Sequence, residues 1–327
     1  MSKEQGAQGG ALWVVLLMVA IVVLIWSGSA LLVAQQLRFP PSYRRPRTDH
    51  QFAPLPATIA NPTEFADPKA AAGAEFEDLA IERKDGARLR AWFIAGENQT
   101  PIILLHGLGG DRRQMLPYMR FLHAAGFPVL MIDSINSGQS DDLGTGVGYG
   151  WSERADVLAS EAKLQAMGFA RIGALGISQG AAEAILAQSE RHGLAAIVSD
   201  SAYSNLGQLL RGIPSIAMMN PLFTRTVLWA ARIGLGQSVD QISPAQAAAN
   251  LQCALMVIQG REDKLVTVAD AKAIFAASRQ PKELWIVDKA RHTGALRLDP
   301  KEYANRVDQF FKAHLSRGER SAGAGSG

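Results

Sequence analysis

From Pro101 onward, short apolar runs alternate along the chain with longer stretches of helical periodicity. Apolar runs this short are typical of strands buried on both faces, and the helices between them supply the crossovers that parallel strands need. The pattern predicts an α/β fold, with a mostly parallel central sheet, helices on both faces and functional groups at the carboxyl ends of the strands. The expected strands are 102–105, 129–132, 172–177, 195–198, 255–258 and 284–287, and the expected helices lie near 113–125, 152–167, 179–192, 267–278 and 301–315.

Upstream of this alternation, residues 76–83 and 88–94 alternate apolar and polar side chains around Asp85-Gly86. That arrangement is typical of a β-hairpin. The folded domain is therefore expected to span residues 75–315.

Residues 203–249 interrupt the alternation between two expected strands. They carry only four charged side chains, well below the 19% of the whole chain. We predict a helical, apolar cap inserted over the functional edge of the sheet. Its large apolar side chains either line a substrate pocket or form the cap's own core. They are Leu206, Ile213, Ile216, Met218, Met219, Leu222, Phe223, Trp229 and Leu235.

The amino-terminal region holds an uncharged segment from Ala11 to Ala34, after a short tail of residues 1–10. As a helix this segment is long enough to cross a hydrocarbon core of about 30 Å. It predicts an uncleaved membrane anchor, although the small residues 27–30 leave a cleaved signal peptide open. The arginines that follow place the folded domain on the cytoplasmic side by the positive-inside rule. An exporting signal-anchor, or arginines that rest on anionic headgroups, are the competing interpretations; these arginines are Arg38, Arg44, Arg45 and Arg47.

Residues 35–74 hold seven of the 15 prolines, so we expect no helix or central strand there but an extended spacer or a wrap over the domain. The tail at 316–327 is rich in Gly, Ser and Ala and is expected to be disordered.

Composition excludes several classes of protein. A net charge of +3 spread over 327 residues gives no clustered basic surface for nucleic acid. The single cysteine, Cys253, excludes an internal disulfide and thiol-rich metal sites, and its apolar surroundings predict a buried structural thiol. No metal site and no organic cofactor is expected.

The strongest chemical motif is Gly176-Ile177-Ser178-Gln179-Gly180. It follows an expected strand and opens an expected helix, which is the context of a nucleophile elbow. The tight turn requires small neighbours, and Gly176 and Gly180 meet that requirement. The alternative is an ordinary turn between a strand and a helix.

A second motif, His106-Gly107-Leu108-Gly109-Gly110, directly follows the strand at 102–105. Fixed backbone N–H groups stabilise the negative oxygen of a tetrahedral intermediate. The amides of Leu108 and Gln179 are the candidates for such an oxyanion hole. Otherwise the glycines simply make a tight turn, within which His106 packs or forms hydrogen bonds.

A base for Ser178 has to come from a loop at a strand end. Of the six histidines, His292 alone follows an expected strand in the right part of the chain, whereas His123, His192 and His314 fall in expected helices and His50 in the spacer. The orienting acid should precede the histidine in sequence, after an earlier strand. Asp263 meets this condition, with Glu262 and Asp200 as rivals. Asp133, Glu153 and Asp156 are expected to cap helices or hold loops.

Together these motifs resemble the α/β-hydrolase superfamily, near its monoacylglycerol-lipase-like and serine-aminopeptidase-like branches, over residues 76–315. The resemblance implies an α/β-hydrolase fold, a Ser178–Asp263–His292 triad and an oxyanion hole from Leu108 and Gln179. One segment departs from it: Ile135-Asn136-Ser137 stand where such proteins often carry Arg-Gly-His, so the active-site entrance is expected to be reshaped. The matching strings are His106-Gly-Leu-Gly-Gly110, Asp133 with Gly138-Gln-Ser140, Gly176-Ile-Ser-Gln-Gly180, Gly260-Arg-Glu-Asp263 and His292-Thr293.

These observations predict a serine hydrolase of carboxylic esters with apolar acyl groups, acting through an acyl-serine intermediate on small-molecule or lipid-like substrates. The same triad also attacks thioesters and amides, so a thioesterase or peptidase is an alternative. A non-catalytic protein that uses the pocket to bind a ligand is the alternative from another class.

Overall fold

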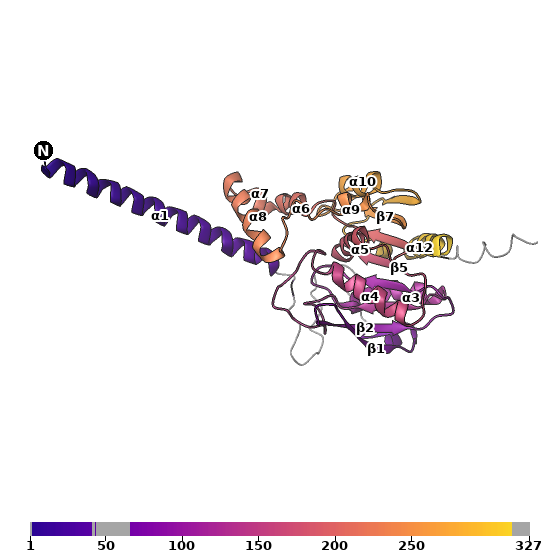
Figure 1. Cartoon of the computed structure of the whole chain (residues 1–327). Helices are drawn as coiled ribbons and strands as arrows, with labels where there is room; N and C mark the ends of the chain where they lie inside the picture. Colours follow the sequence, from indigo (N-terminus) through magenta and orange to yellow (C-terminus); the bar gives the residue numbers. More distant parts are fainter. Residues whose placement is uncertain (1, 41–42, 44–65, 316–327) are drawn as a thin grey trace, which may run out of the picture.

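The computed structural model describes residues 2–40, 43 and 66–315 of the chain. Eight strands form one sheet in the order β1-β2-β4-β3-β5-β6-β7-β8. β2 is antiparallel to both of its neighbours, and all later pairs are parallel. The predicted α/β architecture is therefore confirmed (Figure 1). The strands are β1 (Glu77–Glu82), β2 (Arg88–Ile94), β3 (Ile102–Leu105), β4 (Val129–Ile132), β5 (Gly173–Ile177), β6 (Ala196–Asp200), β7 (Ala254–Gly260) and β8 (Lys282–Val287).

Alternate side chains of the strands enter two separate apolar cores, one on each face of the sheet. In β3, for example, Ile103 and Leu105 belong to one core and Ile102 and Leu104 to the other. The first core is closed by α4 (Arg154–Ala166), α5 (Gln179–Glu190) and α10 (Val268–Ala277). The second is closed by α3 (Leu116–Ala124) and α12 (Pro300–Leu315). The parallel strands are buried on both faces, which explains why they read as continuous apolar runs in the sequence.

Shorter helices complete the domain: the 3₁₀ turn η1 (Arg112–Met115), α2 (Pro68–Ala72), α9 (Pro244–Ala248) and α11 (Ala295–Leu298). α2 corrects the expectation that residues 35–74 contain no helix. Asp67 caps α2, with its carboxylate accepting from the amide of Ala70, and Pro68 occupies the first turn. Proline is tolerated there because the first amides of a helix have no partner within it.

The predicted cap region folds as four helices between β6 and β7. Besides α9 these are α6 (Leu206–Gly212), α7 (Pro214–Ala217) and α8 (Pro221–Leu235). The cap does form part of a core, since Leu206 and Ile216 are buried, but Met218, Leu222 and Trp229 are mostly exposed. Leu206 and Ile216 thus fit the prediction of a core within the cap, and Ile213 lines the cavity described below, but Met218, Leu222 and Trp229 fit neither interpretation.

Helix α1 (Ser2–Arg38) projects from the domain and packs beside α8 (Figure 1). Its stretch from Trp13 to Arg38 is long and apolar enough to cross a membrane, and no other helix among the described residues is. α1 also runs on into the predicted spacer as far as Arg38. The rest of that spacer lies largely outside the described residues, as does the tail at 316–327.

Candidate active site

Ser178 lies in the sharp turn between β5 and α5, with a backbone of φ 52° and ψ −114°. A positive φ is costly for a residue with a Cβ, so the surrounding structure must hold it. A Cβ on Gly176 would approach the carbonyl oxygen of Gly180 to 2.3 Å, and one on Gly180 would approach that of Leu105 to 2.4 Å. Both glycines are therefore required by close backbone approach, which brings Ser178 to the carboxyl edge of the sheet.

His292 is brought to Ser178 by the loop after β8. Its Nε2 lies 2.9 Å from the Ser178 hydroxyl, and its Nδ1 lies 2.7 Å from Oδ2 of Asp263. A carboxylate beside Nδ1 favours the tautomer with the proton on that nitrogen, which leaves Nε2 free to accept from the hydroxyl. The three side chains thus form one continuous chain of hydrogen bonds.

Asp263 is itself held at both oxygens. Oδ1 accepts from the amides of Leu265 and Val266, and Oδ2 accepts from Nε2 of Gln259 at 3.0 Å as well as from His292. Gln259 had not been singled out in the sequence, since an amide at the end of an apolar strand gives no motif. These bonds fix the carboxylate in place and satisfy its buried oxygens.

The rival acids lie elsewhere. Glu262 is exposed, and the buried carboxylate of Asp200 accepts from the hydroxyls of Ser201 and Tyr303, at 2.8 and 3.0 Å. Burial raises the pKa of Asp200 to about 6 despite these two hydrogen bonds. Neither carboxylate is hydrogen-bonded to His292.

Among the other histidines, His123 lies in α3 and His314 in α12, as expected. His192 does not lie in a helix, because α5 ends at Glu190. His50 lies outside the described residues.

Leu108 and Gln179 both line the cavity at Ser178. Gln179 is the first residue of α5, where an amide has no partner within the helix. The loop that carries Leu108 is held by Gln114, whose Oε1 accepts from the Gly107 amide at 3.0 Å. The two residues predicted to form the oxyanion hole are thus brought to the same cavity as Ser178.

His106 does not face the cavity. Its Nδ1 lies 2.9 Å from the Gly107 carbonyl, and its Nε2 accepts from the Ser134 amide at 3.1 Å. It therefore ties the loop after β3 to the loop after β4. The interpretation that His106 forms hydrogen bonds within its turn is correct for its contact with Gly107.

The loop after β4 contains the segment that departs from the family pattern. Asn136 has a φ of 62°, which asparagine tolerates better than most residues with a Cβ. Its side chain accepts from the Leu143 amide and donates to the Gly146 carbonyl, at 2.7 and 2.9 Å. Asn136 therefore holds the 143–146 segment in place, a role that no sequence pattern indicated.

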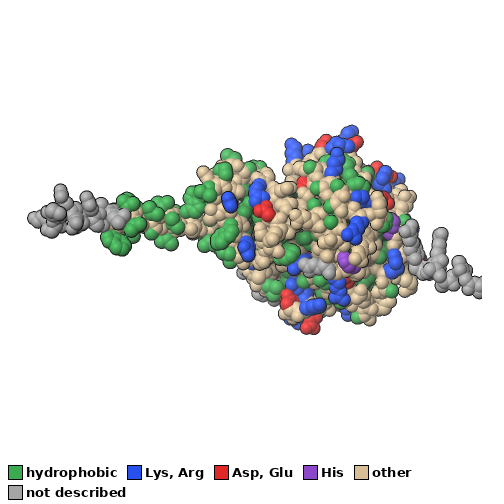
Figure 2. All heavy atoms as spheres, turned by 45° about the horizontal axis from the view of Figure 1, so that its top comes forward, with side chains coloured by type: hydrophobic (Ala, Val, Ile, Leu, Met, Phe, Trp, Pro, Cys, Tyr) green, Lys and Arg blue, Asp and Glu red, His purple; other side chains and the backbone are tan. Residues whose placement is uncertain are grey.

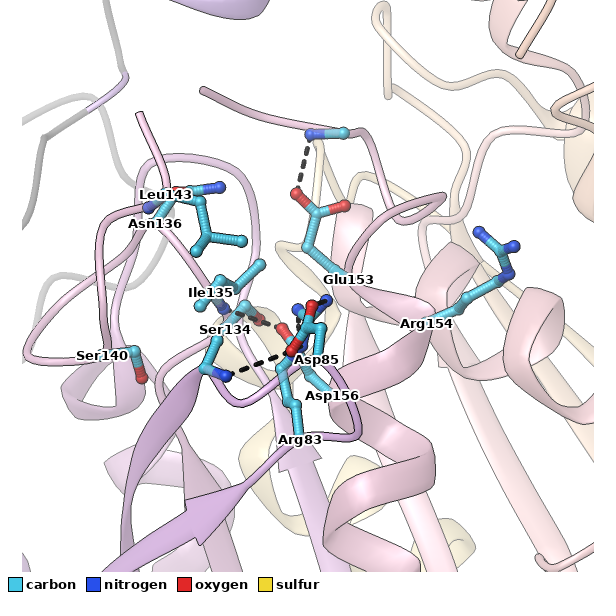
Figure 3. Close-up of polar contacts among 12 residues, drawn as sticks. Arg83, Asp85, Ser134, Ile135, Asn136, Ser140, Leu143, Glu153, Arg154 and Asp156 are labelled. Atoms are coloured by element: carbon cyan, nitrogen blue, oxygen red, sulfur yellow. Dashed lines mark hydrogen bonds and ion pairs between the residues drawn. The ribbon is translucent and has the colours of Figure 1, made fainter. Parts of the chain in front are cut away.

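Carboxylates hold the same loop from below (Figure 3). Asp156 accepts from the Ile135 amide at 2.7 Å and pairs with Arg83 at 2.5 Å. Burial raises the pKa of Asp156 to about 7, against the attraction of Arg83.

Two further carboxylates hold the chain nearby. Glu153 accepts from the amides of Gly148 and Gly150. Asp133, on the same loop, accepts from the Arg112 amide at 2.7 Å. All three carboxylates hold loops, as expected from the sequence.

A cavity of about 430 Å³ opens at Ser178 and His292, with largely apolar walls. The cap contributes Leu209, Leu210 and Ile213. Pro40, two residues after α1, also lines it, which at this position fits the predicted wrap over the domain better than an extended spacer.

The end of α1 is tied directly to the domain near this cavity. The Arg38 carbonyl accepts from the Val147 amide at 2.9 Å, and the Leu37 carbonyl accepts from the Tyr149 hydroxyl at 2.5 Å. The Arg38 guanidinium also donates to the Thr145 carbonyl. The loop that Asn136 holds is therefore also the loop on which α1 ends.

Comparisons with known proteins agree with this geometry. Residues 100–228 match the family described as alpha/beta hydrolase fold. An esterase from Pyrococcus furiosus superimposes with a TM-score of 0.64 and 27% identity, over 81% of this chain and 98% of that one. Est1E from Butyrivibrio proteoclasticus, solved with ferulic acid, gives a TM-score of 0.60 at 17% identity, over 73% of this chain and 100% of that one.

Similar sequences include the uncharacterized protein YfhR of Escherichia coli O157:H7, 23% identical over 67% of this chain and 74% of YfhR. The uncharacterized protein YqkD of Bacillus subtilis is 24% identical over 69% of this chain and 76% of YqkD. With the eight-stranded sheet and the strand–turn–helix at Ser178, these matches define the class: the chain has the α/β-hydrolase fold.

Proposed function

We propose that this protein is a serine hydrolase that cleaves carboxylic esters, with Ser178 as nucleophile, His292 as general base and Asp263 as orienting acid. The observation that carries the proposal is the hydrogen-bond chain from the Ser178 hydroxyl through both nitrogens of His292 to Asp263. A hydroxyl, an imidazole and a carboxylate in this order serve nucleophilic attack on an acyl carbon.

In the first half of the reaction, Nε2 of His292 takes the proton as Ser178 attacks the ester carbonyl. The imidazolium is stabilised by Asp263 and then donates its proton to the leaving alcohol as the acyl-serine forms. In the second half, His292 takes a proton from water, which attacks the acyl-serine, and returns it to Ser178. The amides of Leu108 and Gln179 donate to the negative oxygen in both halves.

The apolar walls of the cavity support an ester with an apolar acyl group, because burying methylene groups is favourable. The similar esterase from Pyrococcus furiosus supports ester cleavage over thioester or amide cleavage. A cavity of about 430 Å³ is large enough for a medium-length acyl chain.

α1 anchors the chain in a membrane as a single span in this proposal, with the catalytic domain on the cytoplasmic side. The apolar stretch that ends at Arg38 supports the anchor, and the arginines after it support the orientation. Cysteines introduced into the catalytic domain should resist an impermeant maleimide in intact cells. Labelling by the maleimide in intact cells would show that the catalytic domain lies on the outer side of the membrane.

A fluorophosphonate probe tests the nucleophile. It should label the wild type and fail on Ser178→Ala, whereas Ser189→Ala, at the far end of α5, should label normally. A folded wild type that stays unlabelled would favour a ligand-binding protein. A series of p-nitrophenyl esters then tests the acyl group: kcat/KM should rise from acetate to octanoate, and a preference for acetate would contradict the apolar pocket.

A further inference from the structure

Four large apolar side chains of the cap are exposed: Met218, Leu222, Trp229 and Ile233, with 88%, 64%, 65% and 70% of their surface accessible. Leu222, Trp229 and Ile233 share one face of α8 because they are spaced by seven and four residues. Met218 precedes that helix. We call these four residues the apolar cap face. An exposed cluster of this kind marks an interaction surface.

The apolar cap face lies beside α1. The rings of Trp26 and Phe223 pack edge to face at 5.1 Å, and the Trp26 indole donates to the Thr226 hydroxyl at 3.3 Å. At the other end of α8, a Cβ on Gly234 would lie 2.4 Å from the Arg38 side chain, so this glycine lies directly against Arg38. α8 thus runs alongside α1 from Trp26 to Arg38.

This packing sets the height of the cap relative to a membrane. Arg38 is the first charged residue after the apolar segment and belongs at the level of the lipid headgroups. Trp26 lies about 18 Å further along the helix, at 1.5 Å per residue. If α1 crosses the bilayer, the start of α8 is therefore held deeper in the membrane than the headgroups, at the level of the acyl chains.

The charges beside the face favour lipid over a second copy of this chain. Exposed Arg225 and Arg232 flank the face on α8, and residues 213–239 contain no Asp or Glu. Arginine side chains can extend along apolar neighbours until their guanidinium groups reach the lipid phosphates, so arginines beside Trp and Leu suit an anionic membrane. Two copies meeting face to face would instead oppose arginine to arginine. In Figure 2 the hydrophobic surface of α1 continues onto the adjoining lobe, where Lys and Arg are set among it.

The catalytic cavity borders the same region. Ile213, immediately before α7, and Pro40, two residues after α1, both line the cavity at Ser178. The cavity therefore adjoins the elements that would face the membrane.

We infer that the apolar cap face is embedded in the bilayer beside α1, and that the cavity receives lipid-soluble esters from the membrane. This inference names the substrate class for the function proposed above and rests on that function and on α1 as a membrane span.

A lipid-depth measurement tests the position of the face. The full chain with Leu222→Cys is labelled with an environment-sensitive fluorophore in vesicles of phosphatidylcholine and phosphatidylglycerol. Leu298→Cys on α11, an exposed leucine outside the cap, is the matched control. Cys253 needs no replacement, because burial raises the pKa of its thiol to about 12.

Spin-labelled lipids should quench about half of the emission at position 222, because Leu222 lies at the start of α8, which packs against Trp26 at the depth of the acyl chains. The label at position 298 should stay unquenched. Equal, weak quenching at both positions would overturn the inference. So would efficient crosslinking of Leu222→Cys between two chains, which would make the face an interface between copies.

A substrate comparison tests the route. In Leu222→Asp/Ile233→Asp, turnover of a long-chain ester dissolved in the vesicles, relative to turnover of aqueous p-nitrophenyl acetate, should fall about ten-fold. Leu298→Asp should leave the ratio unchanged, and an unchanged ratio in the cap variant would overturn the membrane route. Fluorophosphonate labelling in the same vesicles distinguishes the two ways in which the inference can fail. Strong quenching without labelling would contradict the proposed serine hydrolase but not the membrane-embedded face. Labelling without quenching would contradict only the membrane-embedded face.

Discussion

The carboxyl edge of the sheet buries polar side chains, whereas the unit formed by α1 and the cap exposes apolar ones. At the sheet edge, polar groups such as Asp263, Asp200 and His106 are buried, and each has defined partners. On the cap, Trp229 and Ile233 are exposed. The first region is organised by the cost of burying an unpaired polar group in protein. In the membrane position proposed above, the second region would be surrounded by acyl chains, where apolar side chains are exposed without cost.

The largest effect should come from the sheet edge. Ser178→Ala and His292→Ala should each lower kcat at least about ten-thousand-fold, and the double variant should be no worse, because the residues act as one unit. The assay is p-nitrophenyl butyrate hydrolysis in detergent, with Trp229→Ala from the cap as the control that keeps its activity. Additive losses would break the view of the edge as one unit.

Two aspartates at this edge differ in what they hold. Asp263→Asn should lower kcat about a thousand-fold, because an amide at that position no longer stabilises the imidazolium. Asp200→Asn should stay within about ten-fold of wild type, because its partners are Ser201 and Tyr303. A large loss in Asp200→Asn with none in Asp263→Asn would reassign the orienting acid.

Two glycines sharpen the comparison in terms of stability. Gly180→Ala should lower the free energy of unfolding by about 3 kcal/mol, because its Cβ would meet the Leu105 backbone at 2.4 Å. Gly212→Ala in the cap should be neutral or raise it by about 0.5 kcal/mol, because nothing lies within 4 Å and alanine favours the helix. Denaturant titration in detergent measures both, and a harmless Gly180→Ala would contradict the close packing of the elbow.

The smallest expected effect concerns pH. The folded-state pKa of Asp200 is raised by burial from 3.8 to about 6, so its contribution to stability is present below pH 4 and is lost as pH rises through 6. Compared with Asp200→Asn, the wild type should therefore lose about 2 kcal/mol between pH 4 and pH 6. The pH dependence expected for Asp240 in the cap is opposite to that of Asp200. The hydrogen bond from Arg211 lowers the pKa of Asp240, so its contribution to stability is present above pH 4 and is lost on acidification. Asp240→Asn should therefore be slightly less stable than the wild type above pH 4, and the difference should vanish at lower pH. Melting curves across this range give both slopes, and equal slopes would refute the distinction.

The sequence predicted the sheet because its signals are local. Each parallel strand is a short apolar run, and the elbow is a contiguous motif at residues 176–180. His292 and Asp263 followed from chain order and from their position after strands. Chain order and position after a strand can be read from the sequence without knowledge of any long-range contact. The side chains that meet at the carboxyl edge of the sheet could therefore be named in advance.

What could not be predicted depends on contacts between distant segments. Trp26 and Thr226 meet across most of the chain, and Arg38 meets Val147, yet neither pair carries a periodic signal. The support of Asp263 by Gln259, four residues before it, is local but was also missed, because an amide at the end of an apolar strand gives no motif. Within the cap, composition alone cannot separate buried Ile216 from exposed Met218, because both are apolar and two residues apart.

Three hydrogen bonds join Leu37 and Arg38 directly to residues 145–149, so no flexible linker separates α1 from the folded domain there. If α1 spans a membrane as proposed, the domain can move only in the plane of that membrane, whereas a flexible tether would let it sample the adjacent solution. Its encounters with substrate would then scale with surface density rather than with bulk concentration. Esters in a neighbouring membrane would be reached only after they exchange into the membrane that holds α1.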